Sequence, residues 1–177
     1  MRRRFVLALA LAALAPALAL AGDGSVDVGR LEGIYRKRMP NGDSAGATYT
    51  TTDVLRLVRL DQGAAYFDIA LNFFNGHMCA LSGIAKAEGG ALVYRGATGV
   101  GDEICELAIK PARGRIGFAD KGQRCRSTCG ARGGYDGAWF SIARRQTMSA
   151  RERRKILAEA SDEIEAHKAG TAAKPGH

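Results

Sequence analysis

Between Arg30 and Arg144 the chain is built from short runs in which apolar and polar residues alternate, separated by glycine, asparagine, aspartate or proline. In one such run Phe67, Ile69 and Leu71 alternate with polar or small residues. A period of two residues is that of a β-strand with one buried face. No helical spacing interrupts this region, so the pattern predicts an all-β fold.

Eight strands are expected. They span residues 33–38, 53–61, 65–74, 78–87, 91–95, 104–110, 115–120 and 138–144. The turn sequences Glu88-Gly89-Gly90 and Pro111-Ala112-Arg113-Gly114 join neighbouring strands as hairpins, while Pro40-Asn41-Gly42-Asp43 is expected to open a longer loop. Because a flat sheet of eight strands leaves two edges exposed, closure into a barrel or a two-layer sandwich is expected. We favour a small antiparallel up-and-down barrel.

The first 21 residues have the three parts of a cleavable export signal. Three arginines (Arg2–Arg4) precede an apolar run from Phe5 to Leu18, and Ala19-Leu20-Ala21 follows as the cleavage site. The apolar run is shorter than the roughly 20 residues that cross a bilayer. We therefore expect residues 1–21 to be removed, leaving a periplasmic or secreted protein with no stable membrane anchor.

All four cysteines lie in the mature part of the chain: Cys79, Cys105, Cys125 and Cys129. An even number of cysteines in an exported domain predicts two disulfides. Three pairings are possible, and the hairpin order brings all four cysteines to one end of the barrel. Strands two apart lie about 10 Å from each other, which favours Cys105 with Cys125 and Cys79 with Cys129. A zinc site that includes His77 competes with this interpretation but lacks a paired CxxC knuckle, so we predict no metal.

Removal of the signal lowers the formal charge from +8 to +5, because three arginines leave with it. A basic protein favours anionic partners. The cations alternate with acids instead of clustering, so we predict no nucleic-acid partner.

After residue 146 the pattern changes to that of a helix. Ser149 and Glu152 form a capping box, and apolar residues then recur at helical spacing. A helix is expected from about Ala150 to Lys168, and its narrow apolar stripe predicts loose docking. The expected organisation is a disulfide-linked barrel at residues 22–146, a C-terminal helix at 147–169 and a disordered tail at 170–177.

The chain carries no recognisable catalytic or cofactor motif. His77 is the only histidine within the strand region, and a solitary histidine in a turn is more often structural than catalytic. Asp102-Glu103 and Asp120 could be brought together as the carboxylate pair of a glycoside hydrolase, but their spacing does not require it. We therefore predict a protein that is not an enzyme and binds no cofactor.

The segment from Cys129 to Gly137 contains four glycines around Arg132, Tyr135 and Asp136. Glycines permit positive φ and close approach of another group. An arginine and a tyrosine on a disulfide-held loop suit recognition of a carboxylate, a phosphate or a protein groove. Alternatively, Arg132 and Asp136 pair with each other to hold the loop. The predicted binding residues are His77, Arg132, Tyr135 and Asp136.

The run from Phe73 to Cys79, Cys105, and the segment Cys125-x3-Cys129-Gly130-Ala131-Arg132-Gly133 resemble a group of small, uncharacterised periplasmic proteins of Gram-negative bacteria. The resemblance covers roughly residues 31–143. The cysteine framework and strand rhythm of that group are in turn similar to those of periplasmic lysozyme inhibitors, which are small β-barrels that insert loops into a muramidase cleft. The resemblance implies the same mode of action here, without assigning it to individual residues.

Three functions follow as hypotheses. The leading one is a non-catalytic periplasmic binding protein of lysozyme-inhibitor type, whose loops around His77 and from Arg132 to Asp136 contact a protein or an envelope glycan. The second is a calycin-like barrel with a small apolar ligand inside, and the third is a cell-wall hydrolase. The second requires an internal cavity. In a barrel this small, four phenylalanines would fill that space: Phe67, Phe73, Phe118 and Phe140.

Overall fold

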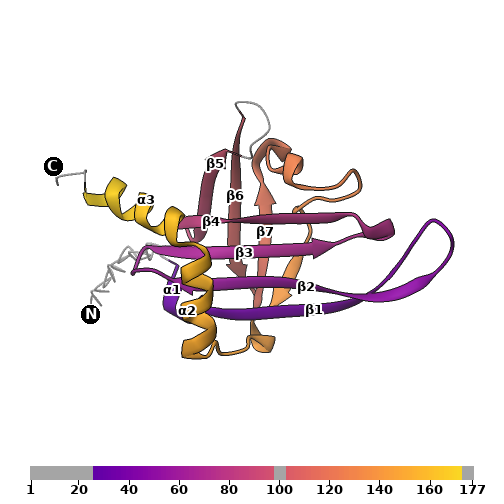
Figure 1. Cartoon of the computed structure of the whole chain (residues 1–177), viewed down its shortest axis with the longest axis horizontal. Coiled ribbons are helices and arrows are strands. Elements are labelled where there is room, and N and C mark those ends of the chain that lie inside the picture. The colour runs from indigo at the N-terminus through magenta and orange to yellow at the C-terminus, as the bar shows by residue number, and fades with distance from the viewer. Residues whose placement is uncertain (1–25, 98–102, 173–177) are drawn as a thin grey trace, which may run out of the picture.

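A computed structural model describes residues 26–97 and 103–172 of the chain (Figure 1). Within these residues, eight antiparallel strands form one sheet in which each strand pairs with the next in chain order. The strands are β1 (Gly33–Gly42), β2 (Thr48–Arg59), β3 (Ala64–Asn72), β4 (Met78–Glu88), β5 (Ala91–Ala97), β6 (Ile104–Ala112), β7 (Arg115–Asp120) and β8 (Trp139–Ser141). The predicted up-and-down arrangement of eight strands is confirmed.

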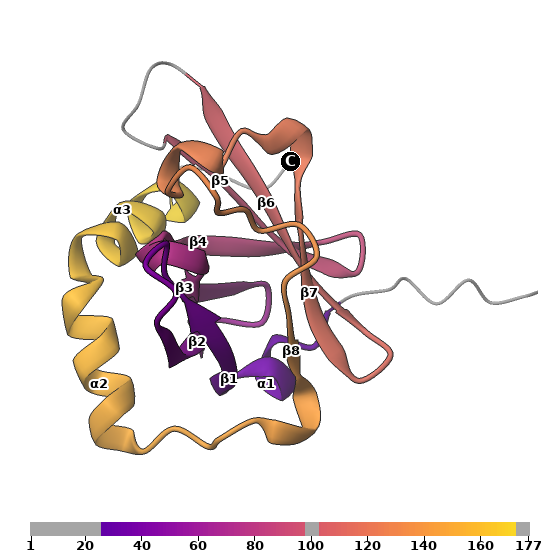
Figure 2. The same ribbon diagram turned by 90° about the vertical axis from the view of Figure 1, so that its right-hand side faces the viewer.

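The sheet curls until its first and last strands meet, as Figure 2 shows for β1 and β8. An isolated antiparallel bridge closes the barrel between Ile34 of β1 and Gln146, which lies five residues beyond the end of β8. Each backbone N–H donates to the carbonyl of the other residue, at 3.0 and 2.9 Å. The result is a nearly closed barrel with little free strand edge.

The hairpin of β1 and β2 extends further than expected. Pro40, predicted to open a loop, lies within β1 and pairs with Thr50. At this position β1 is an edge strand that pairs only with β2. The N–H that proline lacks would point away from β2, so its absence removes no hydrogen bond between the strands. The turn follows at residues 43–47, where the Asp43 N–H donates to the Ala47 carbonyl at 3.0 Å and the Asp43 carboxylate accepts from the N–H groups of Ala45 and Ala47.

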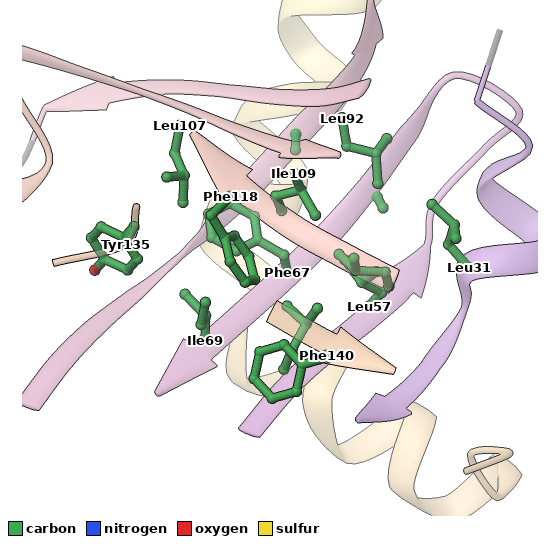
Figure 3. Close-up of a cluster of buried hydrophobic side chains, with 14 of the residues drawn as sticks. Leu31, Leu57, Phe67, Ile69, Leu92, Leu107, Ile109, Phe118, Tyr135 and Phe140 are labelled. Atoms are coloured by element: carbon green, nitrogen blue, oxygen red, sulfur yellow. The ribbon is translucent and has the colours of Figure 1, made fainter. Parts of the chain in front are cut away.

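Side chains from all eight strands fill the barrel (Figure 3). Phe67, Phe118 and Phe140 are buried, and Phe118 meets Phe140 edge to face at 6.0 Å between ring centroids. Phe73 is partly buried and packs against the same cluster. Because these rings occupy the interior, the structure gives the small-ligand hypothesis no support.

The C-terminal segment forms two helices, α2 (Ala150–Glu159) and α3 (Ser161–Ala172), instead of the single predicted helix. Ser149 caps α2 with the predicted capping box, and the helical geometry breaks at Ala160. Ile156, Ala160 and Ile164 pack with Val58 and Tyr66. The prediction of loose docking is therefore wrong, because the break lets both helices turn apolar residues toward β2 and β3.

A four-residue helix, α1 (Val28–Leu31), precedes the barrel and was not predicted. Arg153 of α2 joins this region to the barrel: its guanidinium pairs with Glu32 at 3.0 Å and donates to the Arg59 carbonyl at 2.7 Å. The predicted tail begins at residue 170, but residues 170–172 still belong to α3. Residues 173–177 and the predicted signal peptide at residues 1–21 lie outside the described part of the chain.

Candidate binding site

The turns of an antiparallel meander alternate between the two ends of a barrel, and the cysteines share one of these ends. Disulfides join Cys79 to Cys129 and Cys105 to Cys125, as predicted. Each of the four sulfurs is bonded to one other sulfur in a disulfide, so none is a free thiolate that could bind a zinc ion. We call this region the disulfide end; it includes the β1–β2 turn, the β3–β4 turn, the start of β6 and the segment between β7 and β8. The two disulfides indicate an exported protein that folds in an oxidising compartment.

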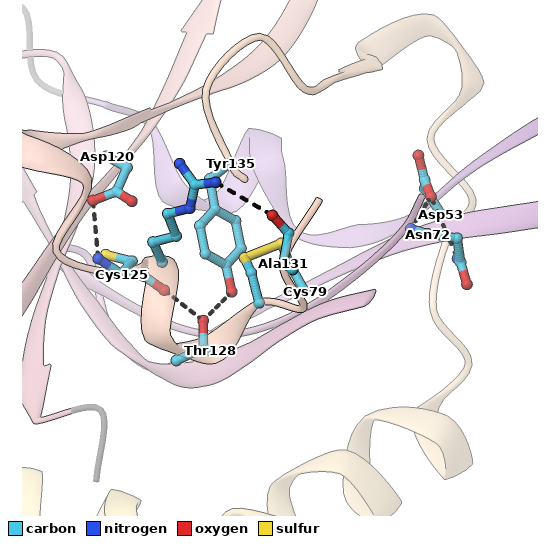
Figure 4. The surroundings of a disulfide bond; sticks show 10 residues. Asp53, Asn72, Cys79, Asp120, Cys125, Thr128, Ala131 and Tyr135 are labelled. Atoms are coloured by element: carbon cyan, nitrogen blue, oxygen red, sulfur yellow. Dashed lines mark hydrogen bonds between the residues drawn. A yellow bond between two sulfur atoms is a disulfide. The ribbon is translucent and has the colours of Figure 1, made fainter. Parts of the chain in front are cut away.

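The segment after β7 is organised around a buried tyrosine (Figure 4). Tyr135 is 0% exposed, and its hydroxyl lies 2.6 Å from that of Thr128, whose hydroxyl in turn donates to the Cys125 carbonyl at 2.8 Å. Burial raises the pKa of Tyr135 to about 12. Tyr135, predicted as a binding residue, is instead a core residue that holds the loop in place.

Asp136 also has a structural role, because its carboxylate accepts a hydrogen bond from the Asp120 N–H at 2.9 Å. Asp120 is buried and accepts from the Cys125 N–H at 3.1 Å. Burial raises the pKa of Asp120, and the nearby Asp136 carboxylate adds to the shift. These two acids thus fix the start of the loop, and the structure pairs neither of them with Arg132.

At two of the four glycines, another part of the chain lies so close to the backbone that a side chain would not fit. A Cβ on Gly130 would lie 2.6 Å from Nδ1 of His77, and one on Gly133 would lie 2.7 Å from Sγ of Cys79. His77 therefore packs against the loop, half-buried, while the Gly130 N–H donates to the Met78 carbonyl at 2.7 Å. The close approach inferred from the glycines occurs, but the approaching groups belong to this chain.

Arg132 is exposed, and its guanidinium lies over the ring of Phe74 at 5.4 Å from the centroid. Phe74 begins the short 3-10 helix η1 (Phe74–Gly76) of the β3–β4 turn. The β1–β2 turn contacts the same helix: the Tyr49 hydroxyl accepts from the Gly76 N–H at 3.2 Å, and the Asn75 side chain accepts from the Ser44 N–H at 3.2 Å. Three segments distant in the sequence thus meet around Phe74.

The large apolar side chains that face solvent lie at this end of the barrel. Within the described residues they are Tyr49, Phe74, Met78 and Ile104, between 37% and 48% exposed. All four come from the turns or strand termini of the disulfide end. We refer to Tyr49, Phe74 and Met78, which lie in or beside the turns that meet around Phe74, together with Arg132 as the rim cluster; Ile104 begins β6 at the same end of the barrel.

Of the predicted binding residues, the structure places Arg132 within the rim cluster and His77 against Gly130 of the same loop. Tyr135 is buried, and Asp136 is exposed but bonded to the Asp120 N–H. Sequence reasoning missed Tyr49, Met78 and Ile104. The pair Phe73-Phe74 carried a usable signal, because adjacent residues of a strand point to opposite faces and one of the two rings had to lie outside.

The residues considered for catalysis make structural contacts in the described part of the chain. His77 packs on Gly130, and His167 of α3 lies 3.9 Å from Asp61 at the opposite end. Asp120 accepts a backbone hydrogen bond and is buried. Of the two acids expected beside it, Glu103 is exposed and Asp102 lies outside the described residues. Across residues 26–97 and 103–172, no group of three or more His, Cys, Asp or Glu side chains is arranged to hold a metal ion.

No protein-family model, curated protein or solved structure matches this chain. In the described residues no helix combines the length and apolar character needed to cross a membrane.

Proposed function

We propose that the protein is a non-catalytic periplasmic binding protein that contacts a partner protein through the rim cluster, in the manner of periplasmic lysozyme inhibitors. The observation that carries this proposal is that every large exposed apolar side chain of the described residues lies at the disulfide end. Exposed apolar groups gathered at one place mark interaction surfaces.

The composition of the rim cluster favours a protein partner over a glycan. Tyrosine, phenylalanine, methionine and arginine are the residue types enriched in protein–protein interfaces. Arg132 lies on the Phe74 ring, which limits the freedom of its side chain before binding. Two disulfides and the buried Tyr135 hold the loop below it, so little conformational entropy is lost on association.

A muramidase cleft is a fitting target for this surface. Such a cleft carries two catalytic carboxylates, and an exposed arginine beside apolar groups can enter it and pair with them. Many animal lysozymes are basic, as this chain is, so long-range attraction between the two is absent. The expected attraction is local, between Arg132 and the acids of the cleft.

A turbidity assay with a peptidoglycan suspension tests the proposal. Lysozyme clears the suspension, and the mature protein is expected to slow that clearing. Clearing by the protein alone would identify a cell-wall hydrolase, and clearing by lysozyme at an unchanged rate would rule out inhibition.

The site is tested with two truncations at exposed positions. Phe74→Ala and Arg132→Ala are each expected to weaken inhibition about thirtyfold, which corresponds to the roughly 2 kcal/mol of an interface hot spot. Arg154→Ala, an exposed arginine on α2, is the matched control and should leave inhibition unchanged. If both rim variants inhibit like the unmodified protein, the rim cluster is not the binding surface.

A further inference from the structure

A second surface lies at the end of the barrel opposite the disulfides. It is a groove of about 290 Å³ at the seam where β1, β7 and β8 meet. Its centre is Trp139, the single tryptophan of the chain. Five cations line it, and we call four of them, all except Arg36, the groove cations: Lys37, Arg113, Arg115 and Arg144.

Two of the groove cations are ordered by the tryptophan ring. Lys37 Nζ lies 4.9 Å from the ring centroid of Trp139, and Arg115 Cζ lies 4.1 Å from it. A cation held over an aromatic ring keeps its N–H donors available at its edge. The ring therefore positions positive charge without neutralising it.

Within the described part of the chain, the groove cations lack acidic partners. Among residues 26–97 and 103–172, no carboxylate oxygen lies within 4.0 Å of their charged nitrogens. Arg36, which also borders the groove, instead donates to the Gln146 side chain. By contrast, Arg95 of β5 pairs with both Glu88 and Glu106. Unpaired cations that converge on one groove favour an anion there.

The backbone at Arg113 supports the same conclusion. Arg113 and Gly114 form the two-residue turn between β6 and β7, with φ of 50° and 76°. Asparagine, aspartate or glycine is favoured at the first of these positions, because an ordinary side chain is strained there. A strained arginine whose side chain lines the groove indicates a role beyond forming the turn.

We propose that this groove binds phosphate groups of an anionic ligand. Arginine forks match the oxygens of phosphate, and a phosphate ester with up to two negative charges compensates more of the groove cations than one carboxylate does. The phosphate can belong to a phospholipid headgroup or to a soluble phosphorylated molecule. This site is independent of the rim cluster.

Trp139 makes the test direct, because all tryptophan fluorescence of the chain comes from this residue. Titration with inorganic pyrophosphate is expected to give a saturable change in its emission. Arg115→Gln and Lys37→Gln should each weaken binding about tenfold, as expected for loss of one charge-assisted hydrogen bond. Arg124→Gln, which removes the same charge at the disulfide end, should leave binding unchanged; an equal effect of all three variants would overturn the proposal.

Because Arg115→Gln and Lys37→Gln also alter the surroundings of Trp139, calorimetric titration supplies the affinities. Arg113→Asn separates binding from folding, since it removes a charge while relieving backbone strain. It is expected to weaken pyrophosphate binding and to raise the melting temperature. Weaker binding with a lower melting temperature, or unchanged binding, would count against a role for Arg113 in the groove.

Further binding experiments identify the kind of molecule that carries the phosphate. Binding to phosphatidylcholine vesicles only when they contain phosphatidylglycerol would indicate a lipid headgroup, and binding to pyrophosphate without vesicle binding would indicate a soluble ligand. Equal binding of polyglutamate would show a general anion surface and overturn the phosphate assignment. Absence of any response to pyrophosphate and to the anionic vesicles would overturn the site itself.

Discussion

Gly133 and Gly134 are neighbours in the loop, yet the structure predicts opposite effects for the same substitution. A Cβ at Gly133 would lie 2.7 Å from Cys79 Sγ and 3.0 Å from Cys129 Cβ, whereas a Cβ at Gly134 would have no atom within 4 Å. Neither residue has a positive φ. Gly133→Ala therefore tests packing against the Cys79–Cys129 disulfide, and Gly134→Ala is its matched control.

The magnitudes follow from two opposing effects. Alanine at a compatible position stabilises a protein by about 0.4–1 kcal/mol, because the unfolded chain loses conformational freedom. Overpacking costs about 1–3 kcal/mol, and the disulfide is not a flexible side-chain end that can move aside. Gly134→Ala should thus raise the free energy of unfolding by about 0.5 kcal/mol, while Gly133→Ala should lower it by about 1–2 kcal/mol. For a chain of this size these changes correspond to roughly 2 °C upward and roughly 3–6 °C downward in melting temperature.

Thermal and urea unfolding, followed by circular dichroism, measure both changes. The decisive measurement repeats Gly133→Ala in a background that carries Cys79→Ala and Cys129→Ala and retains the other disulfide. With Sγ removed, the cost of Gly133→Ala should fall by at least about 0.5 kcal/mol, the coupling expected for residues in contact. An unchanged cost, or a Gly133→Ala variant as stable as Gly134→Ala, would refute the reasoning.

Three further outcomes are expected. Replacing both Cys105 and Cys125 by alanine should lower the free energy of unfolding by about 3 kcal/mol, because their disulfide closes a loop of 20 residues; an unchanged urea midpoint would contradict this. Tyr135→Phe removes the hydroxyl bonded to Thr128 and should cost about 1 kcal/mol in the same assay, with a near-zero cost arguing against that bond. Burial raises the pKa of Asp120 above its ordinary 3.8, so the stability from its protonated form is present below pH 3.8 and lost as pH rises through the raised pKa. Asparagine cannot ionise, so the Asp120→Asn variant should become more stable relative to the unmodified protein as the pH rises from 3 to 7. If the free energies of unfolding of the two proteins change in parallel with pH, the pKa of Asp120 is not raised in the folded state.

The β-strands were predictable because the alternation of apolar and polar residues along a strand reflects which of its faces is buried. Alternation such as that of Phe67, Ile69 and Leu71 identified all eight strands, and their hairpin order brought the cysteines together in the observed pairs. Pro40 was misread, because a proline signals a turn unless the strand is known to lie at an edge. The break between α2 and α3 at Ala160 was missed as well, since alanine is a strong helix former.

The sites were less predictable than the sheet. Tyr135 lies in a segment without periodicity, so nothing local indicated that its ring turns inward. The groove cations come from three distant parts of the sequence, and only closure of the barrel brings Lys37 of β1 beside Trp139 of β8. Arg132 could be found because an arginine among glycines next to a cysteine stands out by composition alone.

Helices α1 and α3 lie on the side of the barrel away from the long β1–β2 hairpin (Figure 1). Their contacts agree with this placement, because Gly29 approaches Arg59 at the end of β2 and His167 approaches Asp61 in the β2–β3 turn. A molecule captured on a sensor chip through an affinity tag at either terminus would therefore point its cysteine-bearing tip toward the solution. Such capture orients every copy alike, which makes surface plasmon resonance a suitable format for screening muramidases.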